Sequence, residues 1–433
     1  MKNYKTPRGT YDILPADTSA WQNVEGLIRD VCQVYDYKEI RVPLFEDTDV
    51  FKRENDTSDM VTKEMYTFTI NNKNYLTLRP EGTAGVIRSY VEHKMYADAD
   101  LPAKLYYCGP MFRYERPQKG RQRQFHQFGV ENIGVKNPMI DAETITLGYS
   151  IVKALGLNRI EVLINTLGDN ESRENYRKAL KEHFKDSVDE LCTDCQTRFN
   201  TNPLRILDCK IDKDHPKMKS VPSMSDYLTK ESKEYFDAVL GYLDALGIPY
   251  KVDPKLVRGL DYYTHTVFEV VSLAKESGAQ STIFAGGRYD GLVEYFNGPS
   301  QSGIGFAMGI ERLMILAEAE GIELRNPDAI DIYVMSMGNV GSLPLTVATE
   351  LRAAGYVTDL NVVERSMKSQ FKSVDRSNAK FIVIIGEDEA SNNEVTIKNL
   401  TTRQQYKCNV EKMIEIIDNL VNEMESEHEP HTH

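Results

Sequence analysis

The sequence has little cysteine and tryptophan, six and one in 433 residues, and it lacks any run of about 18 apolar residues. Without such a run, no helix is expected to cross a membrane. The segment Met1–Pro7 also lacks the apolar stretch of a signal peptide. Six cysteines in a long chain without that signal predict reduced thiols rather than a disulfide framework. We therefore expect a cytoplasmic protein with no membrane partner.

Positively charged residues are also fewer than negatively charged ones. The chain has 52 lysines and arginines against 65 acidic residues, a net charge of −13. This balance excludes a protein whose whole surface binds nucleic acid, but it leaves room for a local basic site. With 41% hydrophobic residues the chain is too apolar to be disordered, and its length predicts two or three domains.

Hydrophobic periodicity predicts a first domain built on a sheet. Residues 104–114 and 124–133 have the pattern of strands, and strands joined by so short a loop pair antiparallel. Residues 168–248 are mostly polar and helical in period, which predicts a helical insertion. The other elements expected here are helices over 17–35, 84–95 and 141–155 and strands over 74–80 and 262–271.

A second domain is expected after a linker over 322–328. Strands alternate with helices from 330 to 424, which predicts a small α/β domain with a largely parallel core. The expected organisation is an α+β domain on an antiparallel sheet over 1–325, with its helical insertion at about 168–248, an α/β domain over 329–425 and a flexible tail over 426–433.

The most informative segment runs from residue 113 to 131. Its first part, 113–123, has five basic residues and one acid, a local charge of +4. Side chains two apart on a strand share a face, which groups Arg113 with Glu115, and Phe125 with Gln127 and Glu131. Such a face suits a ligand with a phosphate, an aromatic base and a polar head. The alternative is a solvated, salt-bridged hairpin.

Three further motifs offer polar groups beside glycines. Glu81, Gly82 and Thr83 end a strand and could hold an ammonium group, although this is also an ordinary strand-to-helix turn. An Arg258-Gly259 step precedes Tyr262 and Tyr263, and it could equally be a strand start with a solvated arginine. The glycines of 303–313 do not fit the dinucleotide fingerprint, yet they lead into a helix that carries Arg312.

Taken together, these motifs resemble the histidyl-tRNA synthetase family of class II aminoacyl-tRNA synthetases. Pro43 with its flanks is similar to class II motif 1, residues 112–131 to motif 2, and 303–313 to motif 3. Residues 256–263 and 286–291 are similar to the two histidine-specific signatures. The resemblance implies a class II catalytic domain, a C-terminal anticodon-binding domain and a homodimer.

The resemblance also implies a reaction and its residues. L-Histidine would attack the α-phosphate of ATP, which enters with Mg²⁺, and the 3′ end of tRNA(His) would then take the histidyl group. The catalytic pair would be Arg113 and Arg258. Histidine would be bound by Glu81, Gly82, Thr83, Gln127, Glu131, Tyr262 and Tyr263, and ATP by Arg113, Glu115, Arg121, Phe125, Arg258 and Arg312.

Two sets of residues are expected to contact tRNA. The motif 2 loop offers Arg116, Gln118, Lys119 and Arg123, placed to meet the acceptor end. In the C-terminal domain Lys368 and Lys372 belong to a basic stripe with a four-residue spacing. Such a stripe is more often a solvated helix face, but in an anticodon-binding domain it would be a plausible backbone contact.

Two alternatives remain open at this point. The spacing Cys192-x2-Cys195-x13-Cys209-x5-His215 is close to that of zinc ligands, but three reduced thiols in an insertion explain it too, and no metal ligand is assigned. The rival function is the non-catalytic regulatory subunit of ATP phosphoribosyltransferase, which shares the catalytic fold. That relative generally lacks the anticodon-binding domain and the Arg-Gly-Leu-Asp-Tyr-Tyr signature, and this sequence has both.

Replacement of Arg258 tests the role that the resemblance gives it. Arg258→Ala should abolish histidyl-adenylate formation while weakening histidine binding far less, because an oriented cation is needed where phosphoryl charge develops. Pyrophosphate exchange near the wild-type rate in this variant would contradict the assignment.

Overall fold

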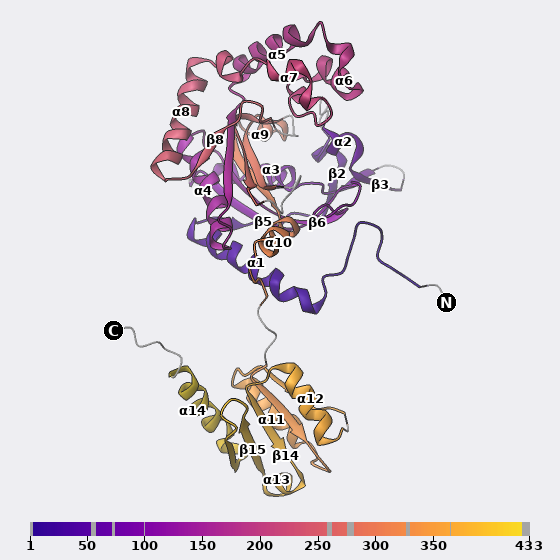
Figure 1. The fold of residues 1–433 in the computed structure, drawn as a ribbon, viewed down its shortest axis with the longest axis vertical. Coiled ribbons are helices and arrows are strands. Elements are labelled where there is room, and N and C mark those ends of the chain that lie inside the picture. Colours follow the sequence, from indigo (N-terminus) through magenta and orange to yellow (C-terminus); the bar gives the residue numbers. More distant parts are fainter. Residues whose placement is uncertain are drawn as a thin grey trace. The chain divides into compact units, whose positions relative to one another are not determined.

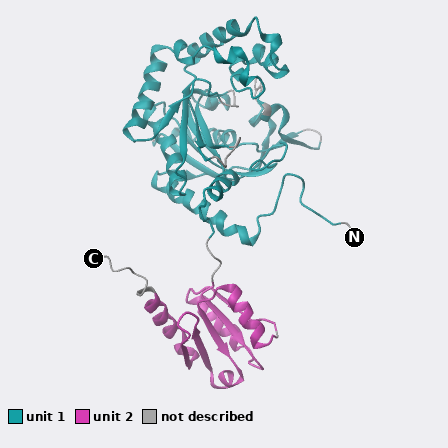
Figure 2. Cartoon of the chain, viewed as in Figure 1, with its two compact units in different colours: residues 1–325 teal, residues 326–433 magenta. Residues whose placement is uncertain are grey.

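The computed structural model describes residues 3–52, 58–71, 74–98, 100–257, 262–274, 281–325, 330–363 and 365–426. Arg258 and its neighbours 259–261 lie outside these ranges, as does most of the tail predicted at 426–433. The chain forms two compact units, Met1–Arg325 and Asn326–His433 (Figures 1 and 2). Within the described ranges, no helix has the length and apolar character needed to cross a bilayer.

The first unit is built on an eight-stranded sheet in the order β1-β5-β6-β11-β10-β9-β7-β8 (Figure 1). The strands are β1 Lys38–Glu39, β5 Ala103–Phe112, β6 Gln124–Ile133, β7 Ile160–Thr166, β8 Tyr250–Val252, β9 Thr264–Ser272, β10 Thr282–Asp290 and β11 Ser302–Gly309. All neighbours pair antiparallel except the short edge strands β1 and β8. The predicted antiparallel sheet is therefore confirmed.

The two faces of this sheet differ in chemistry. On β6, Phe128 and Val130 point into the main hydrophobic core, where helices cover the sheet. The alternate residues Gln127 and Glu131 point to the other face, where they line a cavity. One strand thus supplies both a core and a polar site.

The helices on the core face are α1 (Pro15–Val34), α4 (Pro138–Ala154), α8 (Lys230–Ala245) and α10 (Ile310–Ala319). Both α1 and α4 begin two to three residues earlier than the apolar periodicity indicates. The cause is Pro15 and Pro138, each at the first turn, where the missing N–H of proline costs nothing. Asn137 caps α4 by accepting from the Met139 N–H at 2.9 Å.

A buried ion pair ties the sheet to α4. Arg288 on β10 and Asp141 on α4 are both fully buried, and Arg288 Nε donates to Asp141 Oδ1 at 3.0 Å. Arg288 also donates to Ser302 on β11. A buried guanidinium needs such partners, so this arginine of the 286–291 motif has a structural role.

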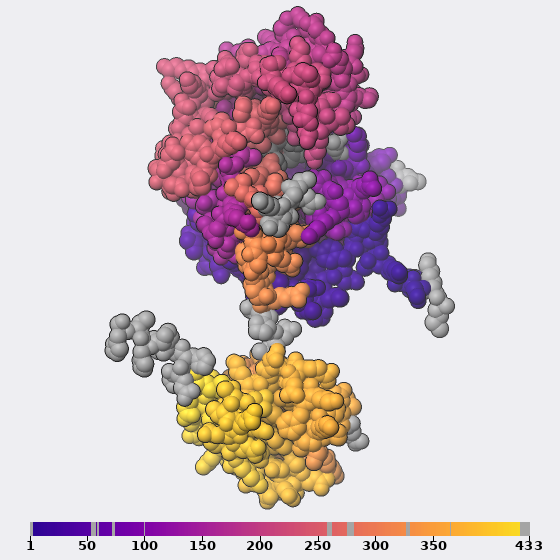
Figure 3. Space-filling model, in the orientation of Figure 1, coloured from indigo at the N-terminus to yellow at the C-terminus, as the bar shows by residue number. Residues whose placement is uncertain are grey.

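The helical insertion contains α5 (Asn170–Phe184), α6 (Thr193–Thr201), α7 (Pro216–Lys219) and α8. Its first three helices surround a core of their own, which includes Tyr176, Leu180 and Phe184. Helix α8 instead packs against α4 and adds Val239 and Leu243 to the main core. In the space-filling view this segment forms one continuous block at the top of the first unit as drawn (Figure 3).

A small antiparallel sheet lies beside the main one, in the order β2 (Phe45–Asp47), β4 (Asn74–Leu78) and β3 (Tyr66–Ile70). Strand β3 was not predicted. Its residues Tyr-Thr-Phe-Thr-Ile do alternate between apolar and polar, so the sequence had the strand pattern although most of these side chains are exposed in the structure. Helices α2 (Asp59–Lys63) and α3 (Thr83–Glu92) flank this sheet in the sequence, and α9 (Leu292–Tyr295) packs on α3.

The second unit is a five-stranded sheet in the order β13-β12-β14-β15-β16. The pairs among β13, β12 and β14 are parallel, as expected for the core of this domain, and β15 and β16 extend the sheet beside β14 as an antiparallel hairpin. The elements are β12 Ile332–Ser336, α11 Leu343–Ala353, β13 Thr358–Leu360, α12 Met367–Ser377, β14 Phe381–Ile385, α13 Glu387–Asn392, β15 Glu394–Asn399, β16 Gln405–Asn409 and α14 Met413–Ser426.

Candidate functional site

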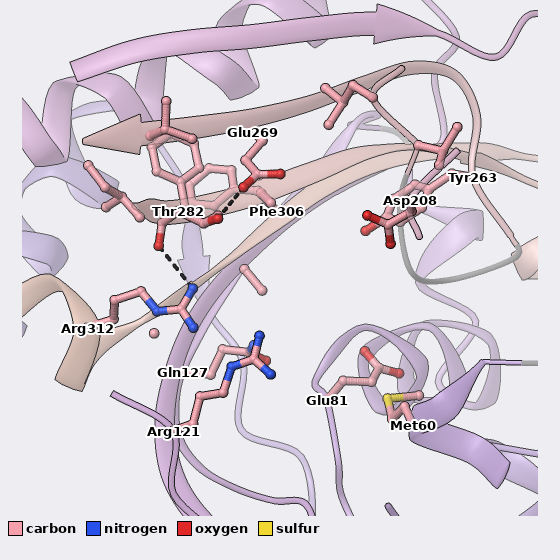
Figure 4. Close-up of a pocket in the computed structure, with 18 of the residues that line it drawn as sticks. Met60, Glu81, Arg121, Gln127, Asp208, Tyr263, Glu269, Thr282, Phe306 and Arg312 are labelled. Atoms are coloured by element: carbon pink, nitrogen blue, oxygen red, sulfur yellow. Dashed lines mark hydrogen bonds between the residues drawn. The ribbon is translucent and has the colours of Figure 1, made fainter. Parts of the chain in front are cut away.

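A cavity of about 770 Å³ opens on the polar face of the main sheet. Strands β6, β9, β10 and β11 supply its floor, and the loop after β5 and the insertion supply its walls. Figure 4 shows Arg121 and Arg312 at one end, with Glu81 and Tyr263 at the other. The cavity brings together these expected site residues: Glu81, Thr83, Arg113, Glu115, Arg121, Phe125, Gln127, Glu131, Tyr262, Tyr263 and Arg312.

Arg113 and Glu115 lie beyond the end of β5, not on a strand as the sequence pattern predicts. The strand ends at Phe112, and the Arg113 N–H still donates to the Arg123 carbonyl at 2.9 Å, in register with the β5–β6 pairing, before the loop begins. Arg113 Nε donates to the Pro80 carbonyl at 2.8 Å, and its guanidinium lies 5.2 Å from the Phe125 ring centroid. These contacts fix a cation and an aromatic ring side by side on the cavity wall.

The cationic end of the cavity groups Arg121 and Arg312 with Arg113, and Glu115 and Glu269 offset part of their charge. Arg121 Nη1 lies 3.3 Å from Glu115 Oε2, while Arg312 Nη1 donates to the Thr282 carbonyl at 3.1 Å. Burial, together with the nearby charge of Arg121, lowers the pKa of the Arg312 guanidinium. An anion bound between these arginines would relieve that repulsion.

A fully buried carboxyl group, Glu131, lies at the other end. Thr83 Oγ1 donates to its Oε1 at 2.6 Å, and Tyr289 Oη donates to its Oε2 at 2.5 Å. Burial raises the pKa of Glu131 to about 8, with Glu81 adding to the shift and the two hydroxyls opposing it. A Cβ on Gly305 would lie 2.2 Å from Oε2, so the carboxyl needs glycine at that position.

Glu81 and Gly82 serve the start of α3. The carboxylate of Glu81 accepts from the N–H groups of Thr83 and Ala84, at 2.5 and 2.9 Å, which orients it at the cavity edge. Gly82 does not line the cavity. A Cβ there would lie 2.2 Å from the ring of Tyr107, so packing against this ring explains why residue 82 is a glycine.

Gln127 and the paired tyrosines complete this end. The rings of Tyr262 and Tyr263 lie 4.8 Å apart, and both line the cavity. Gln127 Oε1 is buried, and it has no hydrogen-bond partner in the part of the chain that the structure describes. A buried acceptor of this kind is normally satisfied, so Gln127 indicates where a donor group of a ligand would bind.

Several cavity residues had no sequence signal. Glu269 on β9 accepts a hydrogen bond from Thr282 and faces the cavity. It was not predicted as a site residue, because it is a single charged residue within an apolar strand. The insertion contributes Arg205, Asp208 and Lys210, which no pattern connects to the sheet. Glu311, one residue before Arg312, accepts from the His126 N–H at 2.9 Å and also lines the cavity.

The remaining expected site residues lie elsewhere. Arg116, Gln118 and Lys119 are exposed on the loop and do not line the cavity. Arg123 instead holds the loop in place, with its guanidinium 4.0 Å from the Tyr114 ring and its Nε donating to the Glu115 carbonyl. Lys368 and Lys372 are exposed on α12 of the second unit, while Phe371 and Val374 of the same helix pack inward.

Comparison with known proteins gives two family matches. A family model described as histidyl-tRNA synthetase matches residues 9–313, and one described as anticodon binding domain matches residues 331–420. Together they cover both compact units.

Individual relatives agree over almost the whole chain. The histidine–tRNA ligase of Lysinibacillus sphaericus is 50% identical over 414 residues, which is 95% of this chain and 98% of that protein. The Bacillus subtilis enzyme of the same name is 50% identical over 416 residues, with 96% and 98% covered.

Solved structures give the same result at the level of shape. Apo histidyl-tRNA synthetase of S. aureus has a TM-score of 0.82 at 43% identity, covering 96% of this chain and 100% of that one. A Bacillus halodurans chain described as an ATP phosphoribosyltransferase regulatory subunit/histidyl-tRNA synthetase has a TM-score of 0.60 at 20% identity, with 88% and 98% covered. The second likeness concerns the fold alone.

The buried Glu131 carboxyl generates a prediction for stability against pH. Its folded pKa of about 8 lies above the ordinary 4.5, so between these values the unfolded chain binds fewer protons and stability falls as pH rises. Relative to Glu131→Gln, wild-type unfolding free energy should fall by up to about 1.4 kcal/mol per pH unit in this window and level off above pH 8. Denaturant titrations from pH 5.5 to 9 measure this difference.

The control is Glu182→Gln, which removes an exposed carboxylate on α5. This variant should follow the wild-type pH dependence. If Glu131→Gln also runs parallel to wild type across the whole range, Glu131 does not hold a proton in the folded protein.

Proposed function

Because the chain belongs to the histidyl-tRNA synthetase family, we propose that this cavity joins L-histidine to ATP and that the histidyl group then passes to tRNA(His). The chain is an enzyme of the aminoacyl-tRNA synthetase class. The observation that carries the proposal is the division of one cavity into two ends. One end has a buried carboxyl and an unpaired amide oxygen, and the other has a cluster of arginines around an aromatic ring.

We assign the carboxyl end to histidine. Glu131 and Tyr263 would hydrogen-bond the imidazole, whose two nitrogens can act as donor and acceptor. Glu81, Thr83 and Gln127 would hold the ammonium group, and Gln127 Oε1 has the free acceptor that this requires. A buried site that hydrogen-bonds its substrate rejects apolar amino acids by several orders of magnitude, since its polar groups would otherwise stay unpaired.

We assign the arginine end to ATP. The adenine would stack between Phe125 and Arg312, Glu115 would contact the base, and Arg113 would hold the α-phosphate together with Arg258 and Arg121. Mg²⁺ would enter with ATP, and the oxygen ligands it prefers are offered at this end by Glu115 and Glu269. The ion would neutralise phosphate charge.

The reaction follows from this placement. A carboxylate oxygen of histidine attacks the α-phosphate, the bond to pyrophosphate breaks, and Arg113 lies where negative charge accumulates. A hydroxyl of the terminal tRNA adenosine then attacks the histidyl carbonyl, and AMP leaves. Orientation by fixed side chains supplies much of the rate, because both reactants are held within one cavity.

The regulatory-subunit alternative has less support. The likeness to such a chain is at 20% identity, whereas histidine–tRNA ligases match at about 50% over nearly the full length. A second unit matched by an anticodon-binding model also fits a protein that handles tRNA.

We further propose that the enzyme is a cytoplasmic homodimer. Its motif 1 region, around Pro43, leads into the sheet β2-β4-β3, where Phe45 and Phe68 are exposed on one face with their ring centroids 6.4 Å apart. Aromatic side chains gathered on a small sheet are typical of a surface that another chain covers.

Histidine-dependent exchange of pyrophosphate into ATP tests the proposed function. Wild-type enzyme should catalyse exchange with histidine and not with the other amino acids. Glu131→Gln should raise KM for histidine by roughly 100-fold with little change in KM for ATP. Arg312→Ala should instead raise KM for ATP by roughly 100-fold with little change in KM for histidine. No histidine-dependent exchange, or equal effects of both variants on both substrates, would refute the proposal.

Charge reversal on α12 tests the proposed tRNA contact. Lys368→Glu/Lys372→Glu should weaken tRNA(His) binding by at least about tenfold at 0.1 M salt and should spare tRNA-independent exchange, because phosphate contacts are electrostatic. A matched control, Lys407→Glu/Lys412→Glu, makes the same charge change at exposed sites of the same unit. Equal Kd values for the two double variants would contradict a specific contact by α12.

A further inference from the structure

The insertion contains a cluster of metal-binding side chains that the proposed reaction does not use. Atoms of Cys192, Cys195, Cys209 and Asp212 all lie within 4.8 Å of one another. The sequence spacing points to His215 as the fourth ligand, but His215 is engaged elsewhere. Its Nε2 lies 3.2 Å from Glu190, and its Nδ1 accepts from the Lys217 N–H. The fourth candidate ligand is therefore Asp212 rather than His215.

The distances in the cluster match a tetrahedral zinc site. Cys192 Sγ and Cys209 Sγ are 3.7 Å apart, and Cys209 Sγ is 3.5 Å from Asp212 Oδ2. With Zn–S of about 2.3 Å and Zn–O of about 2.0 Å, a tetrahedron has S···S of about 3.8 Å and S···O of about 3.5 Å. A disulfide requires about 2.05 Å between sulfurs, so the thiols are not bonded to one another.

The local backbone is arranged around the cluster. Cys192 occupies the N-cap position of the nine-residue helix α6, and Cys195 lies in the first turn of the same helix. The Asp212 N–H donates to Cys209 Sγ at 3.4 Å, and the Cys192 N–H donates to the Asp212 carboxylate at 3.1 Å. These bonds orient the ligands from outside, as in known metal sites.

We propose that Cys192, Cys195, Cys209 and Asp212 bind one Zn²⁺ ion. Three sulfur ligands and one carboxylate oxygen favour zinc over hard cations such as Mg²⁺. In the sequence the ligands form two pairs, Cys192-x2-Cys195 and Cys209-x2-Asp212, each with two residues between its members. Thirteen residues separate the two pairs.

The ion would link two parts of the insertion and hold a loop over the catalytic cavity. Cys195 and Cys209 belong to the small core of the insertion. Arg205, Asp208 and Lys210, from the segment that contains Cys209, line the cavity. The site is therefore structural, and it positions cavity residues without contacting substrate.

Metal analysis of the full chain tests this site. All samples should have His428, His431 and His433 replaced by alanine, so that the tail cannot bind metal. Reduced enzyme supplied with Zn²⁺ and passed through gel filtration should retain about one zinc per chain. Cys195→Ser and Asp212→Asn should each lower the zinc content at least tenfold, while Cys408→Ser and His215→Ala should retain it.

Two further measurements separate loss of a ligand from failure to fold. Co²⁺-loaded wild type should show sulfur-to-metal charge-transfer and tetrahedral d–d absorption, both absent in Asp212→Asn. Zn²⁺, but not Mg²⁺, should raise the Tm of chelator-treated wild type and leave that of Asp212→Asn unchanged. Wild type without stoichiometric zinc, zinc retained by both ligand variants, or a Cys192–Cys209 disulfide in place of metal would overturn the proposal.

Discussion

The structure depends on keeping the carboxyl of Glu131 inside the main sheet with its hydrogen bonds satisfied. Thr83 at the start of α3 and Tyr289 on β10 supply the two hydroxyls, and Gly305 on β11 leaves the space. Three elements from distant parts of the sequence are therefore fixed relative to β6 by one side chain. A buried polar group is costly unless paired, so this arrangement constrains the residue types at all three positions.

The two ends of the cavity differ in their electrostatics. Glu131 is deprived of water and keeps its proton over a wider pH range, whereas Arg113, Arg121 and Arg312 gather positive charge that a polyanion can neutralise. A net charge of −13 is no obstacle to this, because local charge decides what a site binds.

Sequence patterns predicted the antiparallel sheet and the polar face of β6, because alternation along a strand is a local signal. They placed Arg113 and Glu115 on a strand that ends at Phe112, because apolar alternation does not mark the exact residue at which a strand passes into a loop. They also missed Asp208 and Asp212. Both reach their positions through the tertiary packing of the insertion, which a single sequence does not reveal.

The separate hydrophobic cores of the first unit have a consequence for cooperativity. Helix α8 is part of the core of the sheet, whereas α5 to α7 pack around a second core that also contains Val267 of β9. Strand β9 therefore contributes to both cores, because its neighbouring residues Phe268 and Val270 belong to the first. A substitution that loosens the core of α5 to α7 is thus transmitted to a strand of the cavity floor and is not confined to the insertion.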